Sequence, residues 1–280
     1  MITITKSPDI LQLIELAIRE DLSLGDITSD ILIPKHQTGK AVILSKAHGI
    51  LCGQEIAEMV FARIDQAITC NFHLHDSDLM HPGDIIADIS GPVHSILSGE
   101  RIVLNFLQRL SGIASFTHQA TTKCKNTPCR ISDTRKTTPG WRILQKYAVA
   151  CGGGANHRIC LGDGILIKDN HIRAAGGIAQ ALKKALKHRR HLLKVQIEVT
   201  TPQEAHAAVE NGAEALLLDN MSPEQIQSLV NEFGNRVFLE ASGNINETNL
   251  ESYARTGVNL ISMGALTHSF HSLDISLEVE

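Results

Sequence analysis

Apolar and polar positions follow two different spacings over the first hundred residues. Ser7-Pro8-Asp9 is typical of a helix start, and the apolar positions after it recur every three or four residues as far as Arg19. A polar turn over 21–26 ends this helix. The pattern then predicts strands over 41–45, 70–74 and 85–89 and a helix over 55–63. This part of the chain therefore predicts a small open sheet with helices on one face.

The pattern changes after residue 100, where short apolar segments begin to alternate with helical ones. A helical pattern that starts at Glu100 is suited to connect two domains. The predicted strands beyond it are 130–133, 165–168, 195–199, 216–219, 237–241 and 260–263. The predicted helices include 177–186, 202–210, 223–233 and 246–256. This alternation is typical of parallel βαβ units.

A series of such units fits either an open doubly wound sheet or a βα barrel. Polar residues stand repeatedly at the ends of the apolar segments, and a barrel gathers strand ends around one mouth, which favours the barrel. These residues are Asp133, Lys168, Glu198, Asp219, Glu240 and Ser242. The stretch from Leu273 to Val279 alternates strictly, so it predicts a last strand that returns to the N-terminal sheet.

Composition and charge exclude several classes of protein. The chain has 280 residues, of which 43% are hydrophobic and 4% aromatic, and its formal net charge is -4. An acidic chain with few aromatic rings is poorly suited to coat nucleic acid. No apolar run reaches the roughly 20 residues of a membrane span, and the N-terminus lacks a signal-peptide pattern, so we expect a cytoplasmic protein. The six cysteines form no C-x-x-C pair, so we expect reduced thiols rather than zinc ligands or a disulfide framework.

The segment from Asp133 to Arg142 carries the first candidate chemistry. Arg135 and Lys136 follow a predicted strand and stand among hydroxyl side chains and a Pro-Gly turn. Guanidinium offers paired donors and lysine adds a point charge, so this segment suits a carboxylate or phosphate. The alternative is a solvated basic turn.

Two further segments add cations and a titratable ring. His157 and Arg158 follow a run of three glycines, which lets the backbone approach a ligand closely. The alternatives are a flexible connection and a structural histidine. Lys168 ends an apolar strand and needs an anionic partner there, which is either a substrate or a salt bridge to Asp133 or Glu198.

Carboxylates and small residues end the later strands. Glu198 and Asp219 are placed to share a Mg²⁺ ion with substrate phosphates or to face a developing positive charge, although they are also candidate counter-ions for the lysines. The segments 241–245 and 263–268 bring small residues before predicted helices, where backbone N–H groups suit a phosphate. Simple tight-turn glycines are the alternative.

Several motifs in register resemble those of the quinolinate phosphoribosyltransferases. The C-terminal motifs are Asp133-Thr-Arg-Lys-Thr-Thr-Pro-Gly, Gly152-Gly-Gly-Ala-Asn-His-Arg, Leu166-Ile-Lys-Asp-Asn-His, Ile197-Glu-Val and Ser262-Met-Gly-Ala-Leu-Thr-His-Ser. The upstream motifs are Glu20-Asp-Leu, Gly25-Asp-Ile-Thr, Glu100-Arg and Leu107-Gln-Arg-Leu-Ser-Gly-Ile-Ala. The resemblance runs from about Glu20 to the last residues.

The resemblance implies a fold and an assembly. It implies a type II phosphoribosyltransferase-like α/β chain with an N-terminal open α/β sandwich over 1–112, joined by a C-terminal strand over 271–280. An incomplete parallel α/β barrel over 113–270 follows the sandwich. It also implies a homodimer in which Arg101 reaches the neighbouring active site, and the sequence leaves open whether dimers assemble further.

The resemblance also implies the role of each site residue. Lys136, Lys168, Glu198 and Asp219 are the expected catalytic residues, and the two carboxylates face the ribose and Mg²⁺ directly or indirectly. The expected substrate-binding set adds Arg101, Arg135, His157, Arg158, Ser242, Gly243, Asn244, Gly264 and His268. Asn244 departs from the family, which commonly has glycine there. Because asparagine tolerates a left-handed backbone, we expect the turn to persist.

The implied reaction joins quinolinate to the phosphoribosyl group of phosphoribosyl pyrophosphate, with loss of CO₂. Both substrates are anions, which explains why an acidic chain places cations at strand ends. The nearest alternative is the related protein associated with molybdate-transport genes. A non-catalytic phosphate-ligand binder on the same scaffold is a second alternative, which the presence of Glu198 and Asp219 disfavours.

Overall fold

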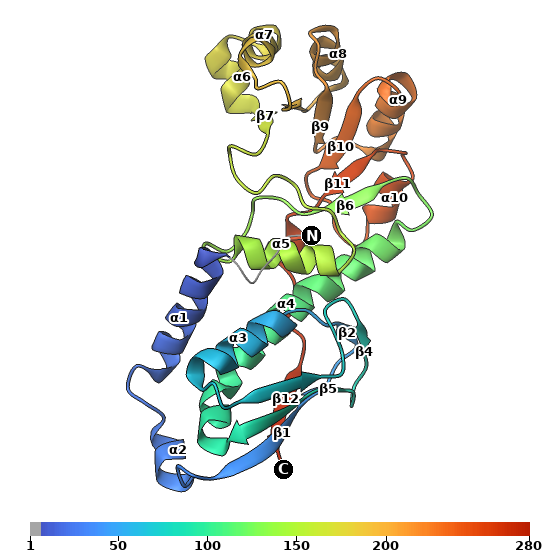
Figure 1. Cartoon of the computed structure of the whole chain (residues 1–280). Coiled ribbons are helices and arrows are strands. Elements are labelled where there is room, and N and C mark those ends of the chain that lie inside the picture. Colours follow the sequence, from blue (N-terminus) through green and yellow to red (C-terminus); the bar gives the residue numbers. More distant parts are fainter. Residues whose placement is uncertain (1–6) are drawn as a thin grey trace. The chain divides into compact units, whose positions relative to one another are not determined.

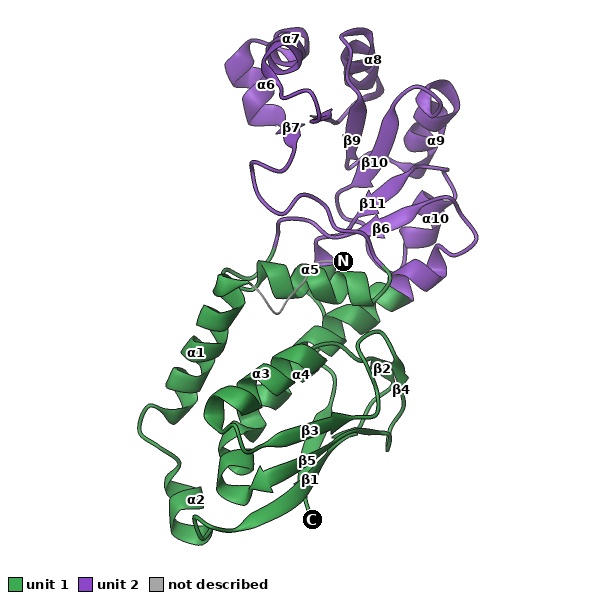
Figure 2. Cartoon of the chain, viewed as in Figure 1, with its two compact units in different colours: residues 1–118, 137–153, 266–280 green, residues 119–136, 154–265 purple. Residues whose placement is uncertain are grey.

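The computed structural model describes residues 7–280, which form two compact units (Figure 2). Among these residues, unit 1 comprises 7–118, Thr137–Gly153 and Leu266–Glu280, and unit 2 comprises Gln119–Lys136 and Gly154–Ala265. Unit 1 thus takes in a segment around residue 145 as well as the end of the chain. Within the described residues, no helix is both long enough and apolar enough to span a membrane.

Unit 1 contains a four-stranded antiparallel sheet in the order β12-β1-β5-β3. Its strands are β1 (Thr38–Ser45), β3 (Thr69–Phe72), β5 (Ile85–Pro92) and β12 (Ile275–Val279), and β2 (Gly49–Ile50) pairs separately with β4 (Leu79–Met80). The pairing of Ile43 with Leu277 confirms the predicted return of the C-terminal strand to this sheet. Gly112 adjoins the returning segment, because a Cβ there would lie 2.2 Å from the carbonyl oxygen of His271.

The helices of unit 1 are α1 (Pro8–Leu22), α2 (Ile27–Leu32), α3 (Gln54–Ile64), α4 (Val93–Lys123) and α5 (Arg142–Cys151), and α4 continues into unit 2. Figure 1 shows α3 and α4 on the same face of the sheet. The helix predicted from Glu100 begins earlier, at Val93. Gly99 interrupts the apolar pattern but lets α4 approach α3, since a Cβ on Gly99 would lie 3.0 Å from the ring of Phe61.

A partly buried polar cluster lies in unit 1 before the start of α3. Asp76 accepts hydrogen bonds from the backbone N–H groups of Gly53 (2.8 Å) and Gln54 (3.0 Å) and from the hydroxyl of Tyr147 (2.7 Å). The sulfur atoms of Cys52 and Cys151 lie within 4.8 Å of this carboxylate and of each other, which the spacing of the cysteines did not predict. Three donors already satisfy Asp76, so its carboxylate caps α3 and anchors α5.

Unit 2 contains a six-stranded parallel sheet in the order β6-β11-β10-β9-β8-β7. The strands are β6 (Arg130–Ser132), β7 (Ile165–Ile167), β8 (Val195–Val199), β9 (Ala215–Asp219), β10 (Phe238–Ser242) and β11 (Leu260–Ser262). The first strand of this sheet, β6, pairs with the last, β11, as in a barrel. The sheet does not close, because β6 and β7 are its two edges among the described residues. This is the incomplete barrel that we expected, and Ala155 forms a parallel bridge to Ser132 on the open side of β6.

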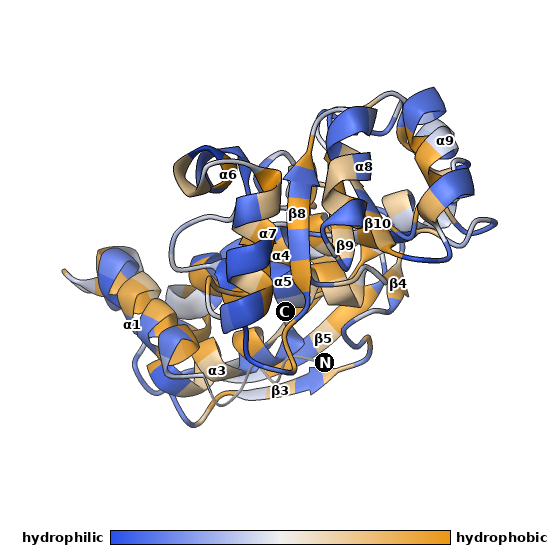
Figure 3. Ribbon diagram, turned by 90° about the horizontal axis from the view of Figure 1, so that it is seen from above, coloured by the Kyte–Doolittle hydropathy of each residue, from blue (hydrophilic) through white to orange (hydrophobic). Residues whose placement is uncertain are grey.

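The core of unit 2 follows from the alternation of side chains along its strands. Ile197, Leu216, Leu218 and Leu239 are fully buried, and β8 packs against α7 (Ile178–His188) and α8 (Pro202–Glu210). The remaining helices are α6 (Asp169–Ala175), α9 (Pro223–Phe233), α10 (Leu250–Ala254) and α11 (Ala265–His268), which crosses the unit boundary. Figure 3 shows that α1 and α9 each contain both apolar and polar residues, as expected of helices with one buried face.

The helix predicted over 246–256 was too long, because α10 covers only Leu250–Ala254. The side chain of Asn246 accepts hydrogen bonds from the backbone N–H of Thr248 (2.9 Å) and from its hydroxyl (2.6 Å). The side chain of Asn249 in turn accepts the backbone N–H of Asn246 (2.8 Å). Such local bonds compete with helical ones, so the first turn of the predicted helix does not form.

Candidate active site

Polar side chains share one face of the parallel sheet in unit 2. The pairings of Asp219 with Ser242, Ser242 with Ser262, and Ser262 with Ser132 place these residues level with one another. Successive side chains on a strand point to opposite faces, and most side chains on the face opposite the helix-covered core are polar, although Ala215, Phe238 and Leu260 also belong to it. The polar residues of this face, here called the polar face, are Ser132, Gln196, Glu198, Asp219, Glu240, Ser242 and Ser262. Barrels that serve only as a core fill this face with branched apolar residues, so this one is suited to bind a polar ligand.

Asp133 fixes the glycine-rich segment beside β6. This fully buried carboxylate accepts hydrogen bonds from the side-chain amide of Asn156 (2.7 Å) and from the backbone N–H of His157 (2.8 Å). The backbone N–H of Asp133 also donates to the carbonyl of Ala155 (3.2 Å). Because these bonds join β6 to the segment after the glycines, they place His157 and Arg158 near the residues that follow β6.

Arg135 and Arg158 lie close enough for their positive charges to interact. Burial lowers the pKa of Arg158, and the positive charge of Arg135 lowers it further, whereas Asp163 acts in the opposite direction. Arg158 Nη1 donates to the carbonyl of Gly164 (3.0 Å). Arg135 Nε is buried and has no hydrogen-bond partner among residues 7–280. Two partly buried guanidinium groups with an unused buried donor form a site that favours an anion.

Lys168 pairs with one of its two candidate counter-ions. Its Nζ lies 2.8 Å from Glu198 Oε2, and Glu198 is the more buried partner, with 13% of its side chain exposed against 47% for Lys168. Lys168 is the N-cap of α6, and its backbone N–H donates to His171 Nδ1 (2.9 Å). The pair leaves the ammonium partly exposed at the end of β7, where it can also meet a ligand.

The ends of β9 and β10 are joined by a network of asparagine side chains. Asn220 Nδ2 donates to Asp219 Oδ2 (2.8 Å), and Asn244 Nδ2 donates to Asn220 Oδ1 (3.0 Å). Asn244 adopts a φ of 50°, so the expectation that the turn persists is confirmed. Gly243 has a φ of 94°, and a Cβ on it would lie 2.3 Å from Asn220 Oδ1. Asn244 therefore adds a hydrogen bond that orients Asp219 through Asn220.

The remaining predicted site residues occupy four further places. Lys136 is exposed, and its backbone N–H donates to Thr134 Oγ1 (3.0 Å). Gly264 follows β11 in unit 2. Arg101 and His268 belong to unit 1, where Arg101 is exposed on α4 and His268 ends α11. Because α11 has only four residues, its dipole is weak and adds little to the backbone N–H groups that the sequence predicts as phosphate ligands over 263–268.

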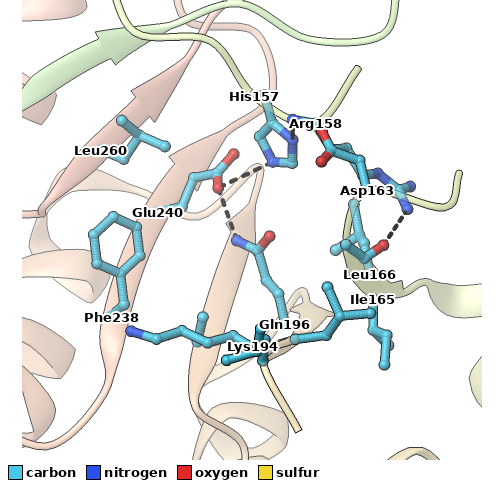
Figure 4. A pocket seen from close by; sticks show the side chains of 14 residues that line it. His157, Arg158, Asp163, Ile165, Leu166, Lys194, Gln196, Phe238, Glu240 and Leu260 are labelled. Atoms are coloured by element: carbon cyan, nitrogen blue, oxygen red, sulfur yellow. Dashed lines mark hydrogen bonds and ion pairs between the residues drawn. The ribbon is translucent and has the colours of Figure 1, made fainter. Parts of the chain in front are cut away.

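A cavity of about 390 Å³ lies among the first residues of the strands in unit 2 (Figure 4). Ile165, Ala215, Phe238 and Leu260 line it, whereas most predicted site residues stand at the opposite, carboxyl ends of the strands. His157 and Arg158 line it as well. Asp163, Lys194, Gln196 and Glu240 line it too, so the cavity combines apolar walls with several charged and polar groups.

Sequence reasoning missed three residues of this site. Asp133 and Glu240 were noted as polar strand ends but were not selected as site residues, and Gln196 was not noted at all. Glu240 is 2% exposed, and its Oε2 accepts a hydrogen bond from Gln196 Nε2 (2.7 Å). A signal for both was present, because Gln196 lies two residues before Glu198 and Glu240 two before Ser242, each on the same face of its strand.

Two family models and several known proteins match this chain over most of its length. The models of the N-terminal and C-terminal domains of quinolinate phosphoribosyl transferase match residues 26–111 and 113–278. A Bacillus subtilis protein named probable nicotinate-nucleotide pyrophosphorylase (carboxylating) is 43% identical over 93% of this chain and 90% of its own length. A Nicotiana tabacum protein named quinolinate phosphoribosyltransferase (decarboxylating) 1b is 38% identical over 97% of this chain and 83% of its own.

A solved structure agrees with the fold as well. The structure of the nicotinate-nucleotide pyrophosphorylase from Francisella tularensis superposes with a TM-score of 0.94 at 40% identity, over 99% of each chain. The family models, the relatives and this structure all extend across both units. The chain therefore belongs to the quinolinate phosphoribosyltransferase family.

Proposed function

We propose that the polar face of unit 2 binds quinolinate through Arg135, Arg158 and Lys168. As a member of its family, the chain is a transferase that joins the phosphoribosyl group of phosphoribosyl pyrophosphate to quinolinate with loss of CO₂. The product is nicotinate mononucleotide, an intermediate of NAD biosynthesis. Quinolinate carries two carboxylates, so its recognition requires donors from more than one direction.

The buried Nε of Arg135 is the observation that carries this proposal. It lacks a hydrogen-bond partner among the described residues. The positive charges of Arg135 and Arg158 also repel each other. An unsatisfied buried donor costs about 1 to 3 kcal/mol, and a bound carboxylate would remove that cost. The carboxylates of quinolinate would also offset the repulsion between the two guanidinium groups.

Glu198 and Asp219 suit the transfer step. They end the adjacent strands β8 and β9 on the polar face, where breaking the bond to pyrophosphate develops positive charge on the ribose. Carboxylates placed beforehand beside this charge stabilise the transition state without reorganisation. No covalent nucleophile is needed, because the two anionic substrates only have to be held in line.

The same two carboxylates fit a Mg²⁺ ion. Both offer oxygen ligands, and Mg²⁺ commonly binds through one or two carboxylates together with substrate phosphates and water. The salt bridge to Lys168 and the amide of Asn220 keep Glu198 and Asp219 oriented on the polar face. When bound, Mg²⁺ would neutralise charge on the pyrophosphate leaving group.

Loss of CO₂ follows from the charge on the alkylated ring. The pyridine nitrogen becomes positive on transfer, so the carbanion left at the adjacent carbon is stabilised by a neighbouring cation. A dehydrated site favours this step, because water would screen that attraction. The carbanion carbon then takes up a proton from solvent, which gives the C–H bond of nicotinate mononucleotide.

We also propose that the protein acts as a homodimer in which Arg101 completes the site of the neighbouring subunit. Arg101 is exposed on α4. Apolar side chains of α2 and the residues before it are also exposed: Leu24 is 91% exposed, Ile27 68%, Ile31 75% and Leu32 68%. An exposed apolar patch of this kind is typical of a subunit interface.

One assay tests the proposed reaction. Purified protein would be incubated with Mg²⁺, phosphoribosyl pyrophosphate and either quinolinate or nicotinic acid, and nicotinate mononucleotide and CO₂ would be measured. We expect equal amounts of the two products from quinolinate, no nucleotide from nicotinic acid, and loss of activity when EDTA removes the metal. Comparable use of nicotinic acid would contradict recognition of the second carboxylate.

A further inference from the structure

Glu240 is a buried carboxylate in a site that must bind two anions. It lies on β10 on the polar face, and its Oε2 faces His157 Nε2 at 3.4 Å and accepts a hydrogen bond from Gln196 Nε2 at 2.7 Å (Figure 4). Its Oε1 is buried without a hydrogen-bond partner among the described residues. A negative charge here weakens anion binding by simple Coulomb repulsion, so its presence requires another explanation.

The surroundings of Glu240 favour its ionised form. Burial alone would raise the pKa of this carboxyl, but the hydrogen bond from His157, with smaller contributions from Ser262 and Gln196, lowers it below its ordinary value. Glu240 is therefore an acceptor at neutral pH.

The two nitrogens of the His157 ring have different partners. Nδ1 accepts the backbone N–H of Arg158 at 2.8 Å, so it carries the lone pair. Nε2 faces the carboxylate of Glu240 and therefore carries the proton. A histidine with one nitrogen held by a carboxylate has a fixed tautomer and a fixed ring orientation.

We propose that Glu240 is a positioning residue for quinolinate binding. It holds the proton of His157 on Nε2, so that Nδ1 accepts the N–H of Arg158 and fixes the backbone from which the guanidinium extends. The bond from Arg158 Nη1 to the carbonyl of Gly164 (3.0 Å) holds the other end of this side chain. The proposal rests on the binding of quinolinate by Arg158.

A pair of substitutions at Glu240 tests the acceptor. Glu240→Gln keeps an oxygen that can accept the proton of Nε2, whereas Glu240→Leu has a similar volume and no acceptor. We expect Glu240→Leu to raise the KM for quinolinate about tenfold, the effect of losing one charge-assisted contact, and to change the KM for phosphoribosyl pyrophosphate less than about twofold. For Glu240→Gln, the KM values for both substrates should stay within about threefold of the wild-type values.

Nitrogen NMR of histidine-labelled protein reads the tautomer directly. The wild type and Glu240→Gln should show His157 with a protonated Nε2 and a bare Nδ1, and Glu240→Leu should lose this preference. An unchanged tautomer together with an unchanged quinolinate KM in folded Glu240→Leu would overturn the proposal. If the wild type shows the tautomer but does not bind quinolinate, the proposed function fails instead.

A second pair of variants covers the case in which Glu240→Leu does not fold. The amide oxygen of asparagine can take the place of Nδ1, whereas the amide of glutamine reaches the place of Nε2. We expect His157→Asn to have a lower quinolinate KM than His157→Gln, because only asparagine can still accept the N–H of Arg158. The reverse order would contradict the proposal.

Discussion

Gly243 and Asn244 show what a single residue can determine at this site. Both have a positive φ, and together they turn the chain back after β10 so that Asn244 reaches Asn220. Asparagine is the residue other than glycine that tolerates this backbone best, which is why its effect was predictable from the sequence. The partner of its side chain was not, because that contact depends on where β9 ends.

The substitution Gly243→Ala tests the link between this turn and Asp219. A Cβ here meets Asn220 Oδ1 at 2.3 Å, so Asn220 must move and Asp219 loses its oriented partner. We expect the KM for phosphoribosyl pyrophosphate to rise about tenfold while quinolinate affinity stays the same.

Gly257→Ala is the matched control for this variant. Gly257 has a φ of 81°, so alanine there has a similar backbone cost of about 1 to 2 kcal/mol, but its nearest neighbour is Val230 at 3.4 Å. It should lower stability without changing either KM. Equal KM values in the two variants, measured by steady-state kinetics, would show that the turn does not orient Asp219.

The buried partners of site residues were the least predictable feature at this scale. Asp133 binds the amide of Asn156 and the backbone of His157, and Glu240 binds Gln196, through contacts between residues 23 to 44 positions apart. The sequence indicates that a buried carboxylate needs such partners but not which they are.

At the scale of elements, the parallel strands were predicted to within about two residues. Short apolar segments flanked by polar residues leave little freedom, so β8, predicted over 195–199, was predicted without error. The helix α6 (Asp169–Ala175) was missed because it contains no buried residue and therefore no apolar stripe. The helix over 246–256 was overestimated because its start is rich in asparagine.

Glu214 connects three elements and gives a stability prediction. It lies in the turn before β9, pairs with Arg189 after α7, and accepts the backbone N–H of Val195 in β8 at 2.8 Å. The hydrogen bond from Arg189 lowers the pKa of Glu214, against burial and with support from Val195. Because folding lowers the pKa of this carboxyl, the ionised group stabilises the folded protein at any pH above its pKa in the unfolded chain. This stabilisation is lost as the pH falls through its pKa in the folded protein.

Glu214→Gln should therefore lower the free energy of unfolding by about 1 kcal/mol at pH 7. The difference from the wild type should shrink as the pH falls below about 4, where the wild-type carboxyl becomes protonated as well. Urea unfolding followed by circular dichroism at both pH values measures it. Glu210→Gln, an exposed change in α8, is the control and should have little effect at either pH. A difference that grows with acidity would contradict the assigned sign.

At the scale of the whole molecule, the polar residues at the strand ends favoured a barrel, and the family resemblance implied that this barrel is incomplete. Alternating strands and helices fit an open doubly wound sheet equally well, and only the pairing of β6 with β11 distinguishes the two. That pairing joins residues about 130 positions apart, which local periodicity does not specify. The return of β12 to β1 was predictable because a strictly alternating strand at the end of the chain needs a sheet to join.

Mixed dimers test the proposed sharing of the active site. Arg101→Ala and Lys168→Ala should each be inactive as homodimers, because every site lacks one residue. A mixed dimer has one site with both residues intact, so random pairing of equal amounts should restore about a quarter of the wild-type activity. Refolding the two variants together, with each refolded alone as a control, measures this. Activity no higher than that of the separate variants would count against donation of Arg101.

Binding of quinolinate to Arg135→Ala tests the central role of the cationic pocket most directly. Isothermal titration calorimetry of the wild type and this variant would be compared with Arg255→Ala, which removes an exposed arginine of the same unit. We expect Arg135→Ala to weaken binding by about tenfold to 150-fold, which corresponds to about 1.5 to 3 kcal/mol, and Arg255→Ala to leave it unchanged. Equal affinities for the wild type and Arg135→Ala would contradict the proposed pocket.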